Sequence, residues 1–317
     1  MMEFSHPVIE YGTYNGDTLL HHQTDVAADY TCAYLKFDVP ADEKLTIRTA
    51  SSFISPEQAA INFNREVADA DVQLISGKAR EQWNNYLGRV EAEGGTDEQL
   101  RTFYSCLYRT LLFPREFYEF DSQGNPVYYS PYDGNVHDGY MYTDNGFWDT
   151  FRAVHPLFTL LYPEVSERVT QSIINAYNES GFMPEWASPG HRGCMIGNNS
   201  VSLLVDAWMK GIQTVDAEKA LEAMIHQTQA RHMEIASVGR DGFEYYDKLG
   251  YVPYPEVPEA TAKTLEYAYA DWCIARFAES LGKQDIADQY YQKAQNYRNL
   301  YYPEHGFMWT KDAKGNY

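Results

Sequence analysis

The feature that most constrains the fold is a change in hydrophobic period near residue 55. Before it, Cys32–Val39 and Lys44–Ile54 alternate apolar and polar residues, as half-buried strands do. After it, apolar residues recur every three or four positions, as on one face of a helix. The sequence therefore predicts the last strands of a β domain over residues 1–54 and a mostly α-helical domain over residues 55–317.

Local signals mark where several predicted helices begin. Ser55 with Gln58, and Thr96 with Gln99, have the spacing of a capping box, and Pro56 suits a first helical position. Glycines and periodic apolar residues delimit further helices, which we expect over residues 165–180, 201–210 and 216–231.

The clearest helical pair is the segment Thr264–Gly282 with the segment that follows it. Gly282 permits a tight reversal, so the two form a predicted αα-hairpin, and the helical period places Trp272 on its apolar face. The long segment Glu116–Gly146 is unusual in a compact domain unless it builds a site. Stacked αα-hairpins with elaborate loops at one end indicate part of an α/α toroid.

Composition excludes several classes of partner. With 45 acidic and 25 basic residues the chain has a net charge of -20, so it would repel a nucleic acid or an anionic membrane. Four cysteines without CxxC spacing disfavour a zinc site, and we expect mostly buried thiols. The 27 Tyr and 6 Trp are instead typical of sugar sites, where rings stack on pyranoses.

The densest group of chemically useful residues lies in Gly139–Pro156. Asp144 and Asp149 flank Trp148 at a predicted helix start, and Arg152 follows three residues after Asp149. A carboxylate can accept two sugar hydroxyls, an indole can stack, and a guanidinium can orient the carboxylate. The alternative is structural: a capping Asp144, a core Trp148 and a surface ion pair between Asp149 and Arg152.

A second candidate group is the loop Gly181–Asn199, which holds Glu185, Trp186 and His191. Acid, indole and imidazole suit hydroxyl recognition, although His191 could equally be a loop histidine with a structural hydrogen bond. The third candidate is Glu266 in the hairpin. Because Asp271 lies about 140° from it around the helix, one of these two carboxylates should be structural.

Four segments carry a resemblance to a known family. They are Phe103–Pro114 (FYSCLYRTLLFP), Asn145–Leu157 (NGFWDTFRAVHPL), Cys194–Ile212 (with CMIGNNS and DAWMKGI) and Thr264–Gly282 (TLEYAYADWCIARFAESLG). In this order they resemble glycoside hydrolase family 92, the calcium-dependent exo-α-mannosidases, over most of residues 55–317. The resemblance implies an amino-terminal β-sandwich followed by an (α/α)6 toroid.

The family resemblance also implies a function. Members remove terminal α-linked mannose from N-glycans or mannans with inversion and with the help of calcium, and we expect α-1,2 linkages and a periplasmic or secreted location. Asp149, in the WDTFR motif, would bind a mannose hydroxyl. The full set of predicted substrate-binding residues is Asp144, Trp148, Asp149, Arg152, Glu185, His191 and Glu266.

The sequence departs from the family pattern in one respect. In the family, the segments that carry the general acid, the general base and the calcium ligands follow the point where residue 317 stands. We therefore assign no catalytic and no metal-binding residue, and expect a truncated, inactive chain that forms a homodimer or binds its missing half. The alternatives are a non-catalytic carbohydrate-binding remnant, an inverting toroid glucosidase and a helical scaffold for protein partners.

Overall fold

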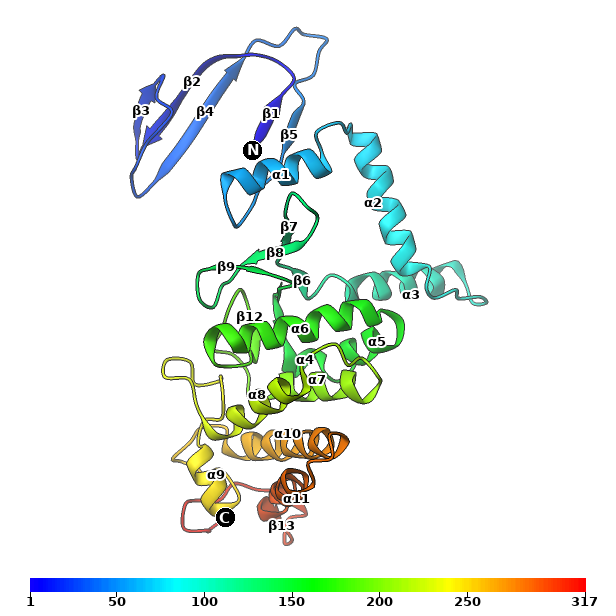
Figure 1. Cartoon of the computed structure of the whole chain (residues 1–317), viewed down its shortest axis with the longest axis vertical. Coiled ribbons are helices and arrows are strands. Elements are labelled where there is room, and N and C mark those ends of the chain that lie inside the picture. The colour runs from blue at the N-terminus through cyan, green and yellow to red at the C-terminus, as the bar shows by residue number, and fades with distance from the viewer. The chain divides into compact units, whose positions relative to one another are not determined.

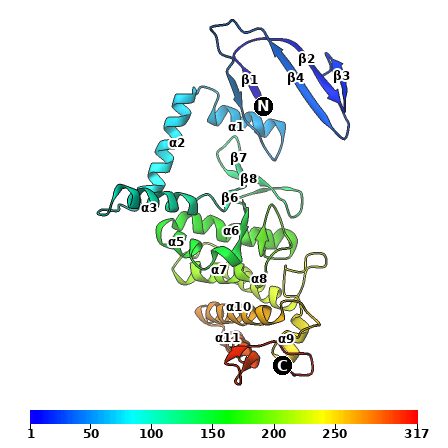
Figure 2. The same ribbon diagram turned by 180° about the vertical axis from the view of Figure 1, so that it is seen from behind.

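The structure, a computed structural model, describes residues 1–317. The chain separates into two compact units, Met1–Gln82 and Trp83–Tyr317, which Figures 1 and 2 draw from opposite sides. The fold is mixed, with helices beside six small sheets of two or three strands. Short strands form where the sequence predicts only loops, because two-residue pairings leave no periodic pattern.

The first unit contains an antiparallel pair and a three-stranded antiparallel sheet in the order β3-β2-β4. Its strands are β1 (Met2–Phe4), β2 (Val8–Asn15), β3 (Thr18–His21), β4 (Thr31–Phe37) and β5 (Ile47–Thr49). Helix α1 (Pro56–Glu66) follows, and the Ser55 side chain caps it by accepting a hydrogen bond from the Gln58 amide. The expected change from strands to helices therefore occurs at residue 55. A domain boundary at that residue stays a prediction.

Helix α2 (Val72–Leu87) leads into the second unit, which holds most of the helices. They are α3 (Asp97–Thr110), α4 (Phe147–Thr150), α5 (Val154–Leu161), α6 (Pro163–Ser180), α7 (Asn199–Met209), α8 (Ala217–Gln229), α9 (Phe243–Leu249), α10 (Ala260–Ser280) and α11 (Gln284–Lys293). A short 3₁₀ helix, Asn296–Leu300, comes after them. None of these helices has the length and apolar character needed to cross a lipid bilayer.

Short strands connect the helices of the second unit. They are β6 (Arg115–Glu116), β7 (Glu119–Phe120), β8 (Pro126–Tyr129), β9 (Val136–Asp138), β10 (Tyr142–Thr143), β11 (Asn145–Gly146), β12 (Trp186–Ala187), β13 (Tyr301–Tyr302) and β14 (Phe307–Met308). The antiparallel pairs β6 with β10 and β11 with β12, and the sheet β7-β8-β9, fold the long segment before α4 into a compact arrangement.

Packing between helices places α7 and α10 against each other. Helix α10 contacts α7, α8 and α11, and α6 contacts α7 and α8, so these helices lie side by side in both ribbon views (Figures 1 and 2). Gly282, with φ of 71°, allows the reversal between α10 and α11. The predicted αα-hairpin is confirmed.

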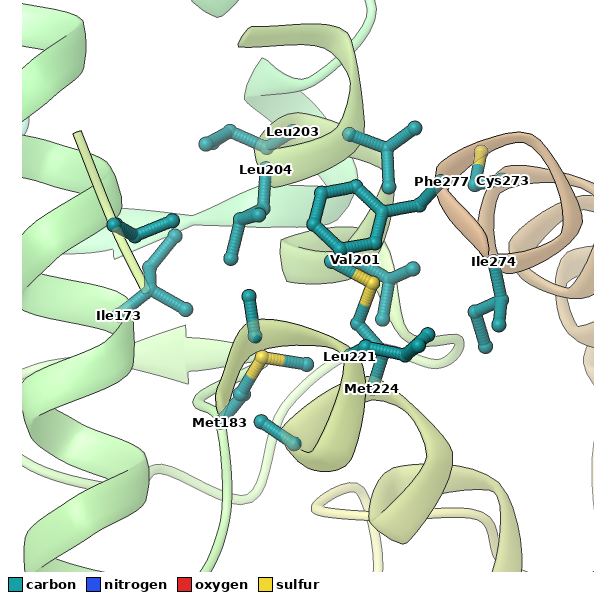
Figure 3. Packing of buried hydrophobic residues seen from close by; sticks show 14 of the residues in the cluster. Ile173, Met183, Val201, Leu203, Leu204, Leu221, Met224, Cys273, Ile274 and Phe277 are labelled. Atoms are coloured by element: carbon teal, nitrogen blue, oxygen red, sulfur yellow. The ribbon is translucent and has the colours of Figure 1, made fainter. Parts of the chain in front are cut away.

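The core of the second unit lies between these helices (Figure 3). Its labelled members come from α6, α7, α8, α10 and the segment before β12: Ile173, Val201, Leu203, Leu204, Leu221, Met224, Cys273, Ile274, Phe277 and Met183. Burial of each large apolar side chain contributes about 1.5–3 kcal/mol before entropic costs. This packing fixes the relative positions of α7 and α10.

Two expectations about burial are wrong. Trp272 is 46% exposed, because the face of α10 that packs against α7 is centred on Ile274 and Phe277. The thiols are not mostly buried, since only Cys273 is buried, while Cys32 and Cys106 are exposed. Small and polar residues occupy many of the buried positions instead. Residue type alone therefore does not predict which side chains are buried here.

Candidate functional site

Two segments that the sequence singles out meet at the start of α4. Strand β11 pairs antiparallel with β12, with Gly146 opposite Trp186. A Cβ atom at residue 146 would lie 1.6 Å from a Trp186 ring atom, so only glycine fits there. This close approach brings the loop Gly181–Asn199 to the helix entrance that carries Trp148 and Asp149.

Glu266 joins the site from α10. The Trp148 indole Nε1 donates a hydrogen bond of 3.2 Å to Glu266 Oε1, and Arg152 Nη2 lies 3.3 Å from the same oxygen. The Arg152 guanidinium also stands 4.8 Å from the centre of the Trp148 ring. Glu266 thus joins Trp148 and Arg152 across 118 and 114 residues of sequence, and together with the loop Gly181–Asn199 all three predicted groups meet here.

Asp149 is exposed and has no hydrogen-bond or ion-pair partner in the protein. The expected pairing with Arg152 is wrong, because Arg152 turns towards Glu266 instead. Two carboxylate oxygens of Asp149 are thus available, and one of them lies close to Gly146, where the Trp186 ring also packs. A carboxylate in that position can accept hydrogen bonds from two neighbouring hydroxyl groups of a ligand.

A cleft of about 560 Å³ opens beside Arg152 and Glu266. This volume is within the usual range of small-molecule sites. The cleft is also lined by Ser202 and Asp206 of α7 and by Tyr269 of α10, which the sequence reasoning missed. A signal was present, since Ser202 and Asp206 are four residues apart and Tyr269 is three residues after Glu266, so each pair shares a helix face.

Glu185 is buried in the protein near Glu266. Its side chain is 2% exposed, and its carboxylate accepts hydrogen bonds of 2.8 Å from the backbone N–H and from the side-chain Nδ2 of Asn199. Burial, together with the neighbouring charge of Glu266, raises the pKa of Glu185 to about 8. In this arrangement Glu185 anchors the first turn of α7, and its role as a sugar ligand stays a prediction.

Asp144 lies beside the helix entrance and is held by other loops. Its carboxylate forms an ion pair with Arg115 and accepts a 3.0 Å hydrogen bond from the Ser188 hydroxyl. The capping role considered for Asp144 is wrong, because the residue that precedes α4 as N-cap is Gly146. Asp144 thus ties together the segments that surround the site.

His191 lies in a separate cluster of rings. Its Nε2 atom is 2.8 Å from the Ser180 hydroxyl, and its ring centre is 4.8 Å from that of Tyr132 and 5.7 Å from that of His232. Burial lowers the pKa of His191 to about 4, so the ring is neutral at pH 7. These contacts match the alternative of a loop histidine with a structural hydrogen bond.

Asp271 is the structural member of the two carboxylates on α10. It is fully buried and forms a 2.7 Å ion pair with Arg240, whereas Glu266 faces Trp148 and Arg152. The expectation that one of the two would be structural is confirmed. Their separation around the helix directs them to different surroundings.

One group of side chains has the spacing of metal ligands, namely Asp133, His137 and Glu179, whose ligand atoms lie within 4.8 Å of one another. His137 Nε2 is 2.9 Å from Asp133, and Glu179 accepts hydrogen bonds from Tyr128 and Ser130. Calcium prefers about six to eight oxygen ligands. This group offers two carboxylates and one nitrogen, so it does not fit calcium.

Comparisons with solved structures identify close relatives. An inverting mannosidase of glycoside hydrolase family 92 from Bacteroides thetaiotaomicron is 99% identical, with a TM-score of 0.96, over 99% of this chain and 43% of that chain. A second family 92 α-mannosidase from the same organism, solved with mannoimidazole, is 29% identical, with a TM-score of 0.85, over 99% of this chain and 41% of that chain.

Sequence comparisons give a consistent result. An uncharacterized secreted glycosidase from Arthroderma benhamiae is 23% identical over 284 residues, which are 84% of this chain and 32% of that protein. The chain thus spans less than half the length of these relatives. The model of the glycosyl hydrolase family 92 catalytic domain matches residues 58–317. Because this match covers most of the sequence, the chain belongs to glycosyl hydrolase family 92.

Proposed function

We propose that this chain is the part of an inverting exo-α-mannosidase that holds the terminal sugar of a mannose-containing glycan. The observation that carries the proposal is the exposed, unpartnered Asp149 carboxylate, next in the chain to Trp148 of the cluster that Trp148 and Arg152 form with Glu266. Family membership supports a glycosidase, and the mannosidases among the relatives support mannose as the sugar.

The cluster has the chemistry needed to recognise a pyranose. Trp148 and Arg152 both bind Oε1 of Glu266, which fixes its carboxylate and leaves Oε2 able to accept a hydroxyl. Asp149 supplies two further acceptor oxygens. Hydrogen bonds to ionised acceptors are stronger than neutral ones and fix the orientation of the ligand. Tyr269, which lines the adjoining cleft, offers a ring for contact with the apolar face of a sugar.

The wider fold is part of the same proposal. The strands of residues 1–54 would be the last strands of a β-sandwich, and the helices of residues 55–317 would form part of an (α/α)6 toroid. The hairpin of α10 and α11 and its packing against α7 and α8 support the second assignment. The proposal also includes an α-1,2 linkage in the substrate, which would be an N-glycan or a mannan. It places the protein outside the cytoplasm. The secreted relative supports that location.

No residue of 1–317 is assigned as acid, base or calcium ligand in this proposal. The acidic group that has metal-ligand spacing does not fit calcium. We therefore expect binding of the sugar without hydrolysis by this chain, and hydrolysis by the longer protein of the solved relative, of which the chain spans 43%. Release of mannose from a simple α-mannoside by the purified chain would contradict this expectation.

Calorimetric titration with mannoimidazole, the ligand of the 29% identical relative, tests the sugar site. We expect the chain to bind it and Asp149→Asn to weaken binding by about tenfold or more, since hydrogen bonds to charged groups contribute about 1.5–3 kcal/mol. Asp285→Asn, at an exposed position in the first turn of α11, is the matched control and should bind normally. Equal affinities of the wild type and Asp149→Asn would refute the proposal.

A further inference from the structure

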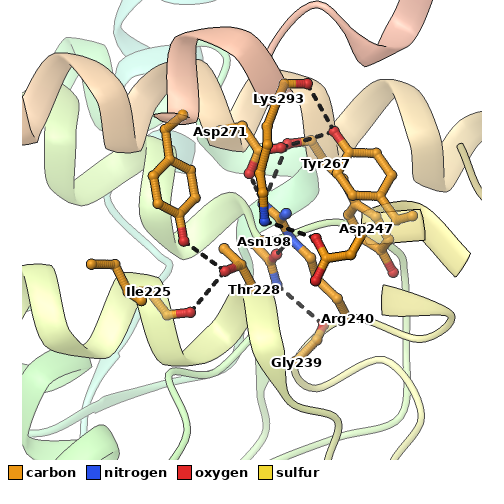
Figure 4. A network of polar contacts seen from close by, with 11 residues as sticks. Asn198, Ile225, Thr228, Gly239, Arg240, Asp247, Tyr267, Asp271 and Lys293 are labelled. Carbon is orange, nitrogen blue, oxygen red and sulfur yellow. Dashed lines mark hydrogen bonds and ion pairs between the residues drawn. The ribbon is translucent and has the colours of Figure 1, made fainter. Parts of the chain in front are cut away.

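A buried ion pair involves α10, the helix that carries Glu266 of the candidate site. Arg240 and Asp271 are both fully buried, and Arg240 Nη2 lies 2.7 Å from Asp271 Oδ1 (Figure 4). Arg240 Nη1 has no hydrogen-bond partner. Removing two charges from water is expensive, and apolar residues of similar size often replace such pairs without loss of stability. The function of this pair should therefore be sought in what it holds in place.

Arg240 links two separate parts of the chain. Its Nε atom donates a 2.7 Å hydrogen bond to Asn198 Oδ1, and Asn198 Nδ2 donates a 3.1 Å hydrogen bond to the Gly239 carbonyl. On its other side the ion pair connects Arg240 to Asp271 of α10, whose Oδ2 accepts a 2.8 Å hydrogen bond from Tyr246. Figure 4 shows Asn198 and Asp271 both directed at Arg240.

Of the two parts of the chain that Arg240 links, one packs against Glu266 and the other carries it. Gly197 precedes Asn198, and a Cβ atom at residue 197 would lie 3.2 Å from Glu266 Cβ. On the other side, Glu266 lies five residues before Asp271 on the same helix. Asn199, which follows Asn198, donates hydrogen bonds from its backbone N–H and its side chain to the buried Glu185. Arg240 thus connects the segment that packs on Glu266 with the helix that carries Glu266.

We propose that Arg240 is a positioning residue for the sugar site. Through Asn198 and Asp271 it holds residues 197–199 against α10, and this contact keeps the Glu266 carboxylate where Trp148 and Arg152 bind it. The link to sugar recognition rests on the proposed function, whereas the positioning of residues 197–199 does not. Lysine cannot replace arginine here, because a single ammonium group lacks the planar fork that reaches two acceptors.

Two variants separate positioning from stability. Arg240→Lys keeps a positive charge near Asp271 but loses the bond to Asn198. The double variant Arg240→Met with Asp271→Leu removes both charges and retains apolar volume, so no unpaired charge is left buried. Asp247→Asn is the control, because Asp247 of the neighbouring helix α9 is 40% exposed and forms its ion pair with Lys293 of α11, not with Arg240.

Three measurements are made on each protein: the melting temperature, amide hydrogen exchange, and the Kd for mannoimidazole. For Arg240→Lys and the double variant we expect exchange in residues 194–200 to rise about tenfold, with exchange in α6 and the melting temperature nearly unchanged. The Kd should rise about tenfold. The control should match the wild type in all three.

Unchanged exchange in residues 194–200 in both variants would overturn the proposal. An equal rise of exchange in α6, with a lower melting temperature, would also overturn it, since the pair would then act on stability alone. If exchange in residues 194–200 rises but the Kd does not, the link to the sugar is refuted. If the wild type itself does not bind mannoimidazole, the proposed function fails, and exchange still decides the positioning role.

Discussion

At the scale of single residues, the site depends on carboxylates whose surroundings differ sharply. Asp149 is exposed without a partner, Glu266 is fixed by two donors, and Glu185 is buried beneath them. All three are acidic residues in aromatic segments, and nothing in the sequence separates them. Only the fold decides which one meets solvent, because the partners of Glu185 and Glu266 come from segments that lie 14 to 118 residues away.

The buried Glu185 predicts a dependence of stability on pH. Its pKa is raised from 4.5 to about 8, so the folded chain keeps a proton that the unfolded chain releases. Its stabilising contribution is therefore complete below about pH 4.5 and is lost as pH rises towards 8, by at most about 1.4 kcal/mol per pH unit.

Urea unfolding of the wild type and Glu185→Gln at pH 5 and pH 8 measures this effect. The variant loses one of the two acceptors that Asn199 uses and should be less stable at both pH values, but it is uncharged at both, so it should lose less stability between them. A parallel loss in both proteins would show that Glu185 does not hold a proton in the folded state.

At the scale of elements, helix ends were predictable and strand pairings were not. Ser55 and Thr96 cap helices as their sequence patterns predict, and Asp216, where a further helix was expected to begin, also caps one. In contrast, β11 and β12 each contain only two residues, which is too short for an alternating pattern. The contact between Trp148 and Glu266 also could not be predicted, because it depends on how α4 and α10 are brought together by the core.

The β11–β12 pair predicts an effect of Gly146→Ala. The new methyl group would overlap the Trp186 ring, and steric overlap of this kind typically costs about 1–3 kcal/mol. Gly77→Ala in α2 is the control, since nothing lies within 4 Å of its added Cβ and alanine favours a helix. Chemical unfolding should show destabilisation only in Gly146→Ala, and equal stability of the two variants would contradict the described packing.

At the scale of the whole molecule, the chain combines a high negative charge with exposed apolar side chains. Leu160 is 75% exposed, and Met209 and Trp272 are nearly half exposed. Exposed apolar side chains that gather on one surface favour association. The sequence predicts the strand-to-helix change and the family, but it does not locate such a surface, because periodicity alone placed Trp272 on the buried face.

We therefore expect the isolated chain to self-associate. Sedimentation velocity over a range of protein concentrations should show a species larger than the 36.4 kDa monomer. Leu160→Glu should shift the distribution towards the monomer by replacing the most exposed of these three apolar side chains with a charge, whereas Leu74→Glu, at an exposed position in α2, should not. A single monomeric species at all concentrations would contradict the expectation.

The most direct test of the central claim is a crystal structure of this chain with mannoimidazole. We expect the ligand beside Trp148, with Asp149 accepting hydrogen bonds from its hydroxyls at about 2.5–3.0 Å. Clear density for the ligand at another site, with the Asp149 carboxylate still without a partner, would contradict the account.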